Sequence, residues 1–167
     1  MQHLPDRSTP STTDPQPRGR DGLARRVSRR VSRWLLMMRV YLLLIVTRGV
    51  VRTFSLETIT ARLGTPQVET PIDGVPDEQL AYARRVGLTI GKAAPTTPTN
   101  SNCYPQALTA WWLLHRRHIP TTIYYGAAFD EDGTALEAHV WLRCGHLIVT
   151  GGGGHRRRFA PLTWFSH

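Results

Sequence analysis

Cysteine is scarce in this chain of 167 residues, and that scarcity excludes one class of protein. The two cysteines, Cys103 and Cys144, cannot build the multi-disulfide framework of a small secreted domain. The first 30 residues contain no apolar run followed by a small-residue cleavage site, so the sequence predicts no secretory signal peptide. We therefore expect a cytoplasmic protein in which a thiol stays reduced.

Lysine is scarcer still, because Lys92 is its only occurrence and arginine carries nearly all of the positive charge. The net charge is +9, and residues 1–33, with eight arginines and three aspartates, contribute +5 of it. Such a basic arm suits nucleic acid, an anionic membrane surface or an acidic partner, or is only a solvated tail. We expect no nucleic-acid partner, because the arm has no interleaved aromatic residues and no recognition motif.

The chain is long enough for one domain with a core, preceded by a tail. Residues 1–22 have almost no apolar side chains, so we expect a disordered basic tail. Residues 23–66 are expected to form a helical segment that continues to a stop at Gly64 and packs on the core. Residues 67–167 are expected to form the core itself.

The helical segment contains a strongly apolar run, Leu35–Val46. A membrane span needs about 20 apolar residues, and this run is shorter and is interrupted by Arg39. The arginines before it also fit a helix that lies on a membrane surface. We interpret the run as a helix packed on the core, with one side left for a partner, and keep peripheral membrane contact as the alternative.

The core changes from a helical to an extended pattern along the chain. Apolar residues at helical spacing predict helices from Pro76 to Gly91 and from Cys103 to His115. β-Branched and aromatic residues separated by turn residues predict strands at 121–129, 137–144 and 146–150, then an extended segment at 158–165. Helices followed by an antiparallel sheet define an α+β domain.

Cys103 and His139 are the candidate catalytic pair. Cys103 lies at a predicted helix start, where the helix dipole supplies partial positive charge that favours a thiolate. His139 lies in the middle of a predicted strand, where alternation places Trp141 on the same face and next to the imidazole. A thiol and an imidazole in contact form an activated nucleophile and its base. The competing interpretation is a buried core cysteine and a hydrogen-bonded strand histidine.

Other groups are weaker candidates. The amides of Asn100 and Asn102, or the backbone N–H of Cys103, are placed to donate to an oxyanion. Cys144, His146 and His155 lack the paired spacing of a structural zinc site, so we expect no metal. Residues 151–154 are four glycines without the lysine and helix of a phosphate-binding loop.

The sequence resembles the leader peptidases of lasso-peptide biosynthesis, which are transglutaminase-like (papain-like) cysteine proteases. The resemblance runs from about Trp34 to Phe165 and is most specific in two segments, CYPQAL at 103–108 and AHVWL at 138–142. It also covers RLG at 62–64, LLHRRHIP at 113–120, VTGG at 149–152 and FAPL at 159–162.

The resemblance implies that Cys103 is the nucleophile and His139 the base, without a cofactor. It also implies a third residue, often an aspartate, about a dozen positions after the histidine, where this chain has Gly151 and no carboxylate. Thr150, a backbone carbonyl, or Asp130 or Asp132 from the hairpin is left to orient His139, unless the pair acts as a dyad.

The resemblance further implies a substrate and partners. The substrate is a ribosomally made precursor peptide, cut between leader and core, and the partners are a separate leader-binding protein and a lasso cyclase. Two alternatives stay open: an acyltransferase on the same fold, and a non-catalytic scaffold that docks the leader.

Overall fold

The computed structural model describes residues 20–98, 102–130, 132–153 and 157–167, with the backbone alone for residues 20–29. The expected disordered tail therefore lies outside the described residues except for residues 20–22, which are helical. The chain divides into two units, residues 1–33 and residues 34–167. The described part of the first unit is helical, and the second unit contains the sheet and the remaining helices.

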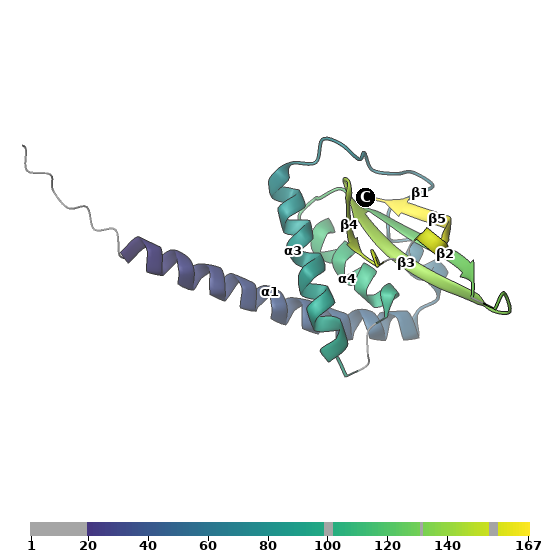
Figure 1. Cartoon of the computed structure of the whole chain (residues 1–167), viewed down its shortest axis with the longest axis horizontal. Helices are drawn as coiled ribbons and strands as arrows, with labels where there is room; N and C mark the ends of the chain where they lie inside the picture. Colours follow the sequence, from purple (N-terminus) through teal and green to yellow (C-terminus); the bar gives the residue numbers. More distant parts are fainter. Residues whose placement is uncertain (1–19, 99–101, 131, 154–156) are drawn as a thin grey trace, which may run out of the picture. The chain divides into compact units, whose positions relative to one another are not determined.

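The fold is α+β, as the sequence predicts (Figure 1). The helices are α1 (Arg20–Thr53), α2 (Leu56–Thr60), α3 (Asp77–Ala93) and α4 (Cys103–His115), with a short 3₁₀ turn at Ala94–Thr96. The strands are β1 (Thr65–Pro66), β2 (Thr122–Phe129), β3 (Leu136–Cys144), β4 (Leu147–Thr150) and β5 (Ala160–Ser166). All neighbouring strands are antiparallel, in the order β1-β5-β2-β3-β4.

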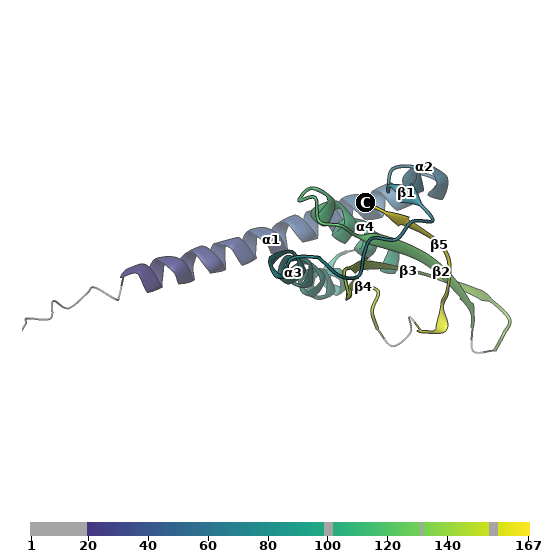
Figure 2. The ribbon, with the colours of Figure 1, turned by 90° about the horizontal axis from the view of Figure 1, so that it is seen from above.

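The predicted N-terminal helix is interrupted where the sequence analysis expected it to continue. α1 ends at Thr53, and α2 begins two residues after Phe54 (Figure 2). Ser55 has extended backbone angles, and its hydroxyl accepts a hydrogen bond from the N–H of Thr58 at 3.3 Å. A serine in this position caps a new helix, which is why the apolar pattern continues across a break in the backbone.

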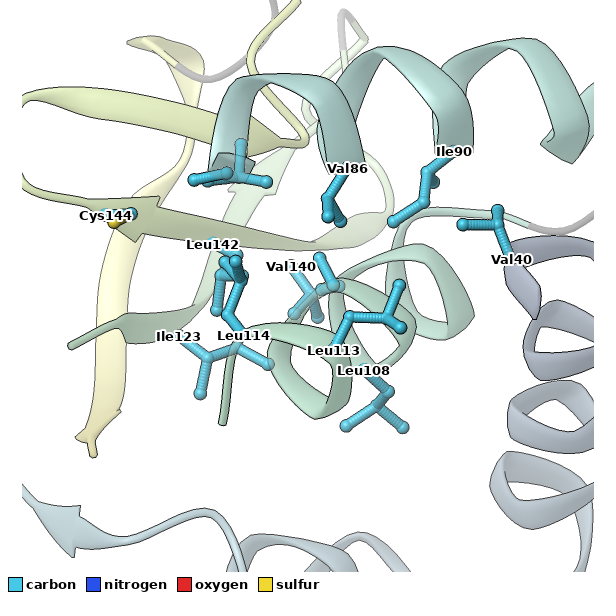
Figure 3. Close-up of a cluster of buried hydrophobic side chains, with 14 of the residues drawn as sticks. Val40, Val86, Ile90, Leu108, Leu113, Leu114, Ile123, Val140, Leu142 and Cys144 are labelled. Atoms are coloured by element: carbon cyan, nitrogen blue, oxygen red, sulfur yellow. The ribbon is translucent and has the colours of Figure 1, made fainter. Parts of the chain in front are cut away.

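α3 and α4 pack on β3 and β4 and cover one face of the sheet (Figures 1 and 2). Side chains of β2 and β3 that point to this face alternate with those that point away, as strand geometry requires. Figure 3 shows the resulting core, in which α3 and α4 contribute side chains opposite the strands. Its labelled members are Val40, Val86, Ile90, Leu108, Leu113, Leu114, Ile123, Val140, Leu142 and Cys144.

Residues 34–53 of α1 pack on α4 along one stripe. Val40 and Leu44 are fully buried, and the Thr47 hydroxyl lies 3.2 Å from the carbonyl oxygen of Pro105 and 3.0 Å from the hydroxyl of Thr109. The opposite side of the helix is exposed, so only some of the apolar side chains in this run pack on the core. By length and composition alone, Arg30–Thr53 is apolar enough to cross a membrane, a test that a helix packed on a core also passes.

Candidate active site

Cys103 is the first residue of α4, and it is a half-buried free thiol. The preceding residue, Asn102, has extended backbone angles but makes no capping bond with its side chain. Its Oδ1 instead accepts a hydrogen bond from the Arg48 guanidinium at 3.3 Å. The first N–H groups of a helix have no intrahelical partners, so this helix start presents free N–H groups beside Cys103.

His139 lies on β3 opposite Gly126 of β2, and its ring is held by a backbone carbonyl. The Nε2 atom lies 3.0 Å from the carbonyl oxygen of Gly151. A carbonyl oxygen only accepts hydrogen bonds, so Nε2 carries the proton in the neutral ring and Nδ1 has the free lone pair. The Gly151 carbonyl therefore orients the imidazole and leaves Nδ1 as the basic nitrogen.

The backbone at residue 151 requires glycine. Its φ is +71°, in the region that favours glycine, and an added Cβ would lie 2.7 Å from the carbonyl oxygen of Val140 and 2.7 Å from Cβ of Trp141. An aspartate at this position, which the family resemblance leads one to look for, would clash with β3. The glycine thus brings its carbonyl to the ring in place of a carboxylate.

Two aromatic rings hold the imidazole plane. The Trp141 ring stacks on it with centroids 5.9 Å apart and planes 23° apart, and the Phe159 ring does so at 4.9 Å and 29°. Trp141 also stacks on Tyr124 at 5.3 Å and is only 3% exposed. The expectation that Trp141 lies beside the imidazole is therefore confirmed. This column of rings limits how far the imidazole can turn away from the Gly151 carbonyl.

The first turn of α4 lies at the part of the sheet that carries His139. The ring of Tyr104 meets the ring of Tyr125 edge-on at 5.5 Å. Tyr125 pairs with Val140 across the β2–β3 ladder, and the next pair is Gly126 with His139. Burial raises the pKa of the Tyr125 hydroxyl well above its usual value, so this ring is neutral beside the site.

Cys103 and His139 are not hydrogen-bonded to each other in the part of the chain that the structure describes. Strand alternation places His139, Trp141 and Arg143 on the sheet face opposite Val140 and Leu142, which pack toward α4. Contacts between catalytic groups are often long in a free enzyme and tighten when substrate binds. The imidazole is not on the sheet face that packs on α4, and the pairing of Cys103 with His139 stays a prediction.

The other candidate residues have different surroundings. Thr150 is buried, and its hydroxyl has no hydrogen-bond partner among the described residues. The Asp130 carboxylate accepts hydrogen bonds from the N–H and hydroxyl of Thr134 at 2.7 and 3.1 Å, which closes the β2–β3 turn. Backbone N–H groups, chiefly that of Ala135, lower the pKa of Asp130. Asp132 is exposed in the same turn. Asn100 lies outside the described residues.

The second cysteine has a different environment from the first. Cys144 is fully buried at the end of β3, and burial raises the pKa of its thiol, partly offset by the charge of Arg143. His155, the third member of the weaker zinc grouping, lies outside the described residues. Within the described ranges, no three histidine, cysteine, aspartate or glutamate side chains gather as a metal site would need.

Two residues of the site were not predicted from the sequence, Arg48 and Phe159, whereas the Gly151 carbonyl fits the backbone carbonyl that is one of the candidates to orient His139. Arg48 gave no distinct signal, because α1 carries several other arginines. Gly151 begins a run of glycines directly after a strand, and such a run marks backbone with special geometry. Phe159 had no signal, because its stacking on His139 depends on the path of the loop between β4 and β5.

A family model described as the transglutaminase-like superfamily matches residues 43–163, which include Cys103, His139 and Gly151. No curated protein and no solved structure matches the chain.

Proposed function

The chain belongs to the transglutaminase-like superfamily, and from this membership we propose that it is a cysteine endopeptidase acting in lasso-peptide maturation. Membership of the superfamily suggests activity of the cysteine protease or acyltransferase type. The finer proposal is that the protein removes the leader from a ribosomally made precursor peptide. It rests on the segments at 103–108 and 138–142, where the sequence resembles the leader peptidases.

The observation that carries the proposal is the bond from His139 Nε2–H to the Gly151 carbonyl oxygen. This bond fixes the tautomer in which Nδ1 is basic, and it supplies the orientation that a third catalytic side chain supplies elsewhere. In the proposed Cys103–His139 dyad, the Gly151 carbonyl takes the place of the third residue. The proposed dyad needs neither a carboxylate nor a cofactor.

In the proposed reaction, His139 Nδ1 takes the proton of the Cys103 thiol, and Sγ attacks the carbonyl carbon at the end of the leader. The tetrahedral oxyanion is stabilised by the backbone N–H groups at the start of α4 and by the Asn102 amide. Nδ1–H then protonates the nitrogen of the scissile bond, which leaves as the free amine of the core peptide. Water, deprotonated by Nδ1, hydrolyses the thioester and releases the leader with a new carboxylate.

The freed amine is the group that a lasso cyclase would join to a side-chain carboxylate, so we propose a cyclase and a separate leader-binding protein as partners. A reducing cytoplasm suits this chemistry, because the nucleophile must stay a free thiol. The reaction itself uses only groups of this chain and water.

The proposal is tested with the full chain, a lasso precursor peptide and a leader-binding protein, with products followed by mass spectrometry. We expect cleavage at one bond, and we expect His139→Ala to slow single-turnover cleavage at least about 100-fold. The matched control is His146→Ala, which changes an exposed histidine in the β3–β4 turn and should cleave normally.

Three outcomes contradict the proposal in different ways. Near-normal cleavage by His139→Ala would move the base to another histidine. A product that carries a second amine in place of the new carboxylate would identify an acyltransferase, since an amine and not water would have resolved the thioester. Binding of the precursor without any new product would identify a scaffold.

A further inference from the structure

One side of α1 is apolar and uncovered. The side chains of Trp34, Leu42 and Val46 are 63%, 57% and 58% exposed, and those of Leu35, Met38 and Ile45 are each at least 40% exposed. These six residues are called the outer face of α1. Exposed apolar patches rimmed by polar groups mark surfaces that bind a protein or a membrane.

The outer face is continuous and broad. Its members recur at helical spacing, i, i+1, i+4, i+8, i+11 and i+12, so they lie together on the side opposite the buried Val40, Leu44 and Thr47. Two adjacent pairs, 34–35 and 45–46, make this face wider than the two-in-seven stripe of a coiled-coil seam. Its width suits a broad apolar phase better than a single partner helix.

The charge around the outer face is of one sign. Residues 22–56 contain no aspartate or glutamate, whereas Arg39 and Arg52 lie within residues 34–53 of α1. A second copy of the chain would bring arginine against arginine, so this face is poorly suited to pairing with itself. An anionic surface would meet complementary charge from Arg39 and Arg52 and no acidic side chain of α1 in this range.

A basic cavity of about 480 Å³ adjoins the outer face at Leu42, which lines it together with Arg39, Arg116 and Arg117. Arg116 lies over the ring of Trp112 at 5.0 Å, and Arg117 lies over the ring of Tyr82 at 4.0 Å. These cation–π contacts hold two guanidinium groups in place at the lining of one cavity. Apolar surface and positively charged cavity lining therefore meet at Leu42.

We propose that the outer face of α1 and the Arg39–Arg116–Arg117 cavity dock the protein on an anionic membrane surface. Lipid phosphates are held at the cavity, and the outer face enters the boundary between head groups and acyl chains. The helix lies on the membrane and does not cross it, because Val40, Leu44 and Thr47 are engaged with the core. This inference is independent of the proposed peptidase activity, since it uses none of the site residues.

The experiment measures flotation of the purified full chain with vesicles of equal parts phosphatidylglycerol and phosphatidylcholine, against phosphatidylcholine alone. We expect binding to the anionic vesicles that weakens with added salt, and little binding to the neutral ones. Leu42→Asp should weaken binding at least about tenfold, because a leucine side chain that inserts into the membrane is replaced by a charge that anionic lipid repels. The matched control is Leu88→Asp, which changes a leucine of α3 that is 62% exposed and should bind as the parent does.

A second variant tests the charge without touching the apolar face. Arg116→Gln with Arg117→Gln should weaken binding by about fivefold for each arginine removed, and inorganic phosphate should not compete if the anion is a lipid head group in a bilayer. Circular dichroism and thermal melting establish that each variant is folded. The proposal is overturned if the parent protein does not float with anionic vesicles, or if Leu42→Asp floats as well as Leu88→Asp. The proposal is also overturned if the outer face binds an acidic amphipathic helix and does not bind the vesicles.

Discussion

Cys103 and Cys144 differ in exposure, which controls whether a thiol can react. Cys103 is half-buried at a helix start, whereas Cys144 is enclosed by the core and burial raises the pKa of its thiol. We therefore predict that iodoacetamide at neutral pH modifies Cys103 in the folded protein and leaves Cys144 unmodified. Peptide mapping by mass spectrometry reads the two sites separately. Modification of Cys144 before denaturation would contradict this assignment.

Alanine variants of the two cysteines should distinguish a loss of catalysis from a loss of stability. Cys103→Ala should abolish precursor cleavage and leave the thermal midpoint nearly unchanged, since a half-buried thiol contributes little to the core. Cys144→Ala should keep cleavage while lowering stability by about 1–2 kcal/mol through the small cavity that it leaves. Cleavage by a folded Cys103→Ala protein would end the nucleophile assignment.

Gly151 and Gly133 offer a matched comparison at the residue scale. Their φ angles are +71° and +69°, but a Cβ at Gly133 would meet nothing within 4 Å, whereas one at Gly151 would collide with β3. Gly133→Ala should cost about 1–2 kcal/mol from backbone strain alone. Gly151→Ala should cost a further 1–3 kcal/mol, approximately, from overpacking.

The functional effect should also differ between these two variants. Gly151→Ala displaces the carbonyl that holds His139, so cleavage should fall and its pH dependence should shift, while Gly133→Ala keeps the parent profile. Denaturant unfolding measures the stability, and single-turnover cleavage across pH measures the function. Equal losses of stability in the two variants would show that the backbone at residue 151 can relax.

At the scale of the element, α1 has one apolar side that is buried and one that is exposed, and substitutions on the two sides should affect stability differently. Leu44 is fully buried against the core, and Leu42, two residues earlier, is 57% exposed. We predict that Leu44→Ala lowers the free energy of unfolding by about 2–5 kcal/mol. Leu42→Ala should change it by less than about 0.5 kcal/mol. Urea unfolding followed by circular dichroism gives both values, and similar losses for the two would mean that α1 packs differently.

At the scale of the whole molecule, Arg143 joins segments far apart in the chain. Arg143 is buried, with 8% of the residue exposed. Its guanidinium donates hydrogen bonds of 2.8–3.0 Å to four groups: the Tyr124 hydroxyl, the Gly145 carbonyl, the Thr70 carbonyl and the Glu69 carboxylate. These bonds hold the loop between β1 and α3 on the sheet face that also carries Trp141. The hydrogen bonds of Arg143 therefore support the stacked rings, including Trp141, that orient His139.

We predict that Arg143→Lys destabilises the fold by about 2–3 kcal/mol, because a lysine cannot reproduce the bonds of the planar guanidinium. Glu69→Gln should change stability by less than about 1 kcal/mol, since that carboxylate is 47% exposed. Proteolysis should also show faster cutting within residues 67–76 in Arg143→Lys. An intact loop and unchanged stability would mean that Thr70 and Thr122, whose hydroxyls lie 2.8 Å apart, hold the loop without Arg143.

Local pattern was enough for much of the structure. The bounds of α4, the strands β2 to β4 and the alternation that places Trp141 beside His139 follow from helix starts, turn residues and side-chain period, which are properties of neighbouring residues. The apolar pattern that ran through Phe54 did not reveal the break before α2, because the capping bond of Ser55 is independent of hydrophobic period. The Cys103–His139 assignment remains a prediction of the sequence and of the family match.

Tertiary structure alone decided the remaining features. β5 pairs between β1 and β2, and this order depends on contacts between residues about a hundred positions apart. The Gly151 carbonyl reaches His139 only because a glycine with positive φ turns the chain back over β3. Sequence determined that a cysteine begins a helix and that a histidine lies within a strand beside a tryptophan, since side-chain type and local period are properties of neighbouring residues. Which groups orient them, and which side of α1 stays uncovered, depended on long-range packing that no local pattern encodes.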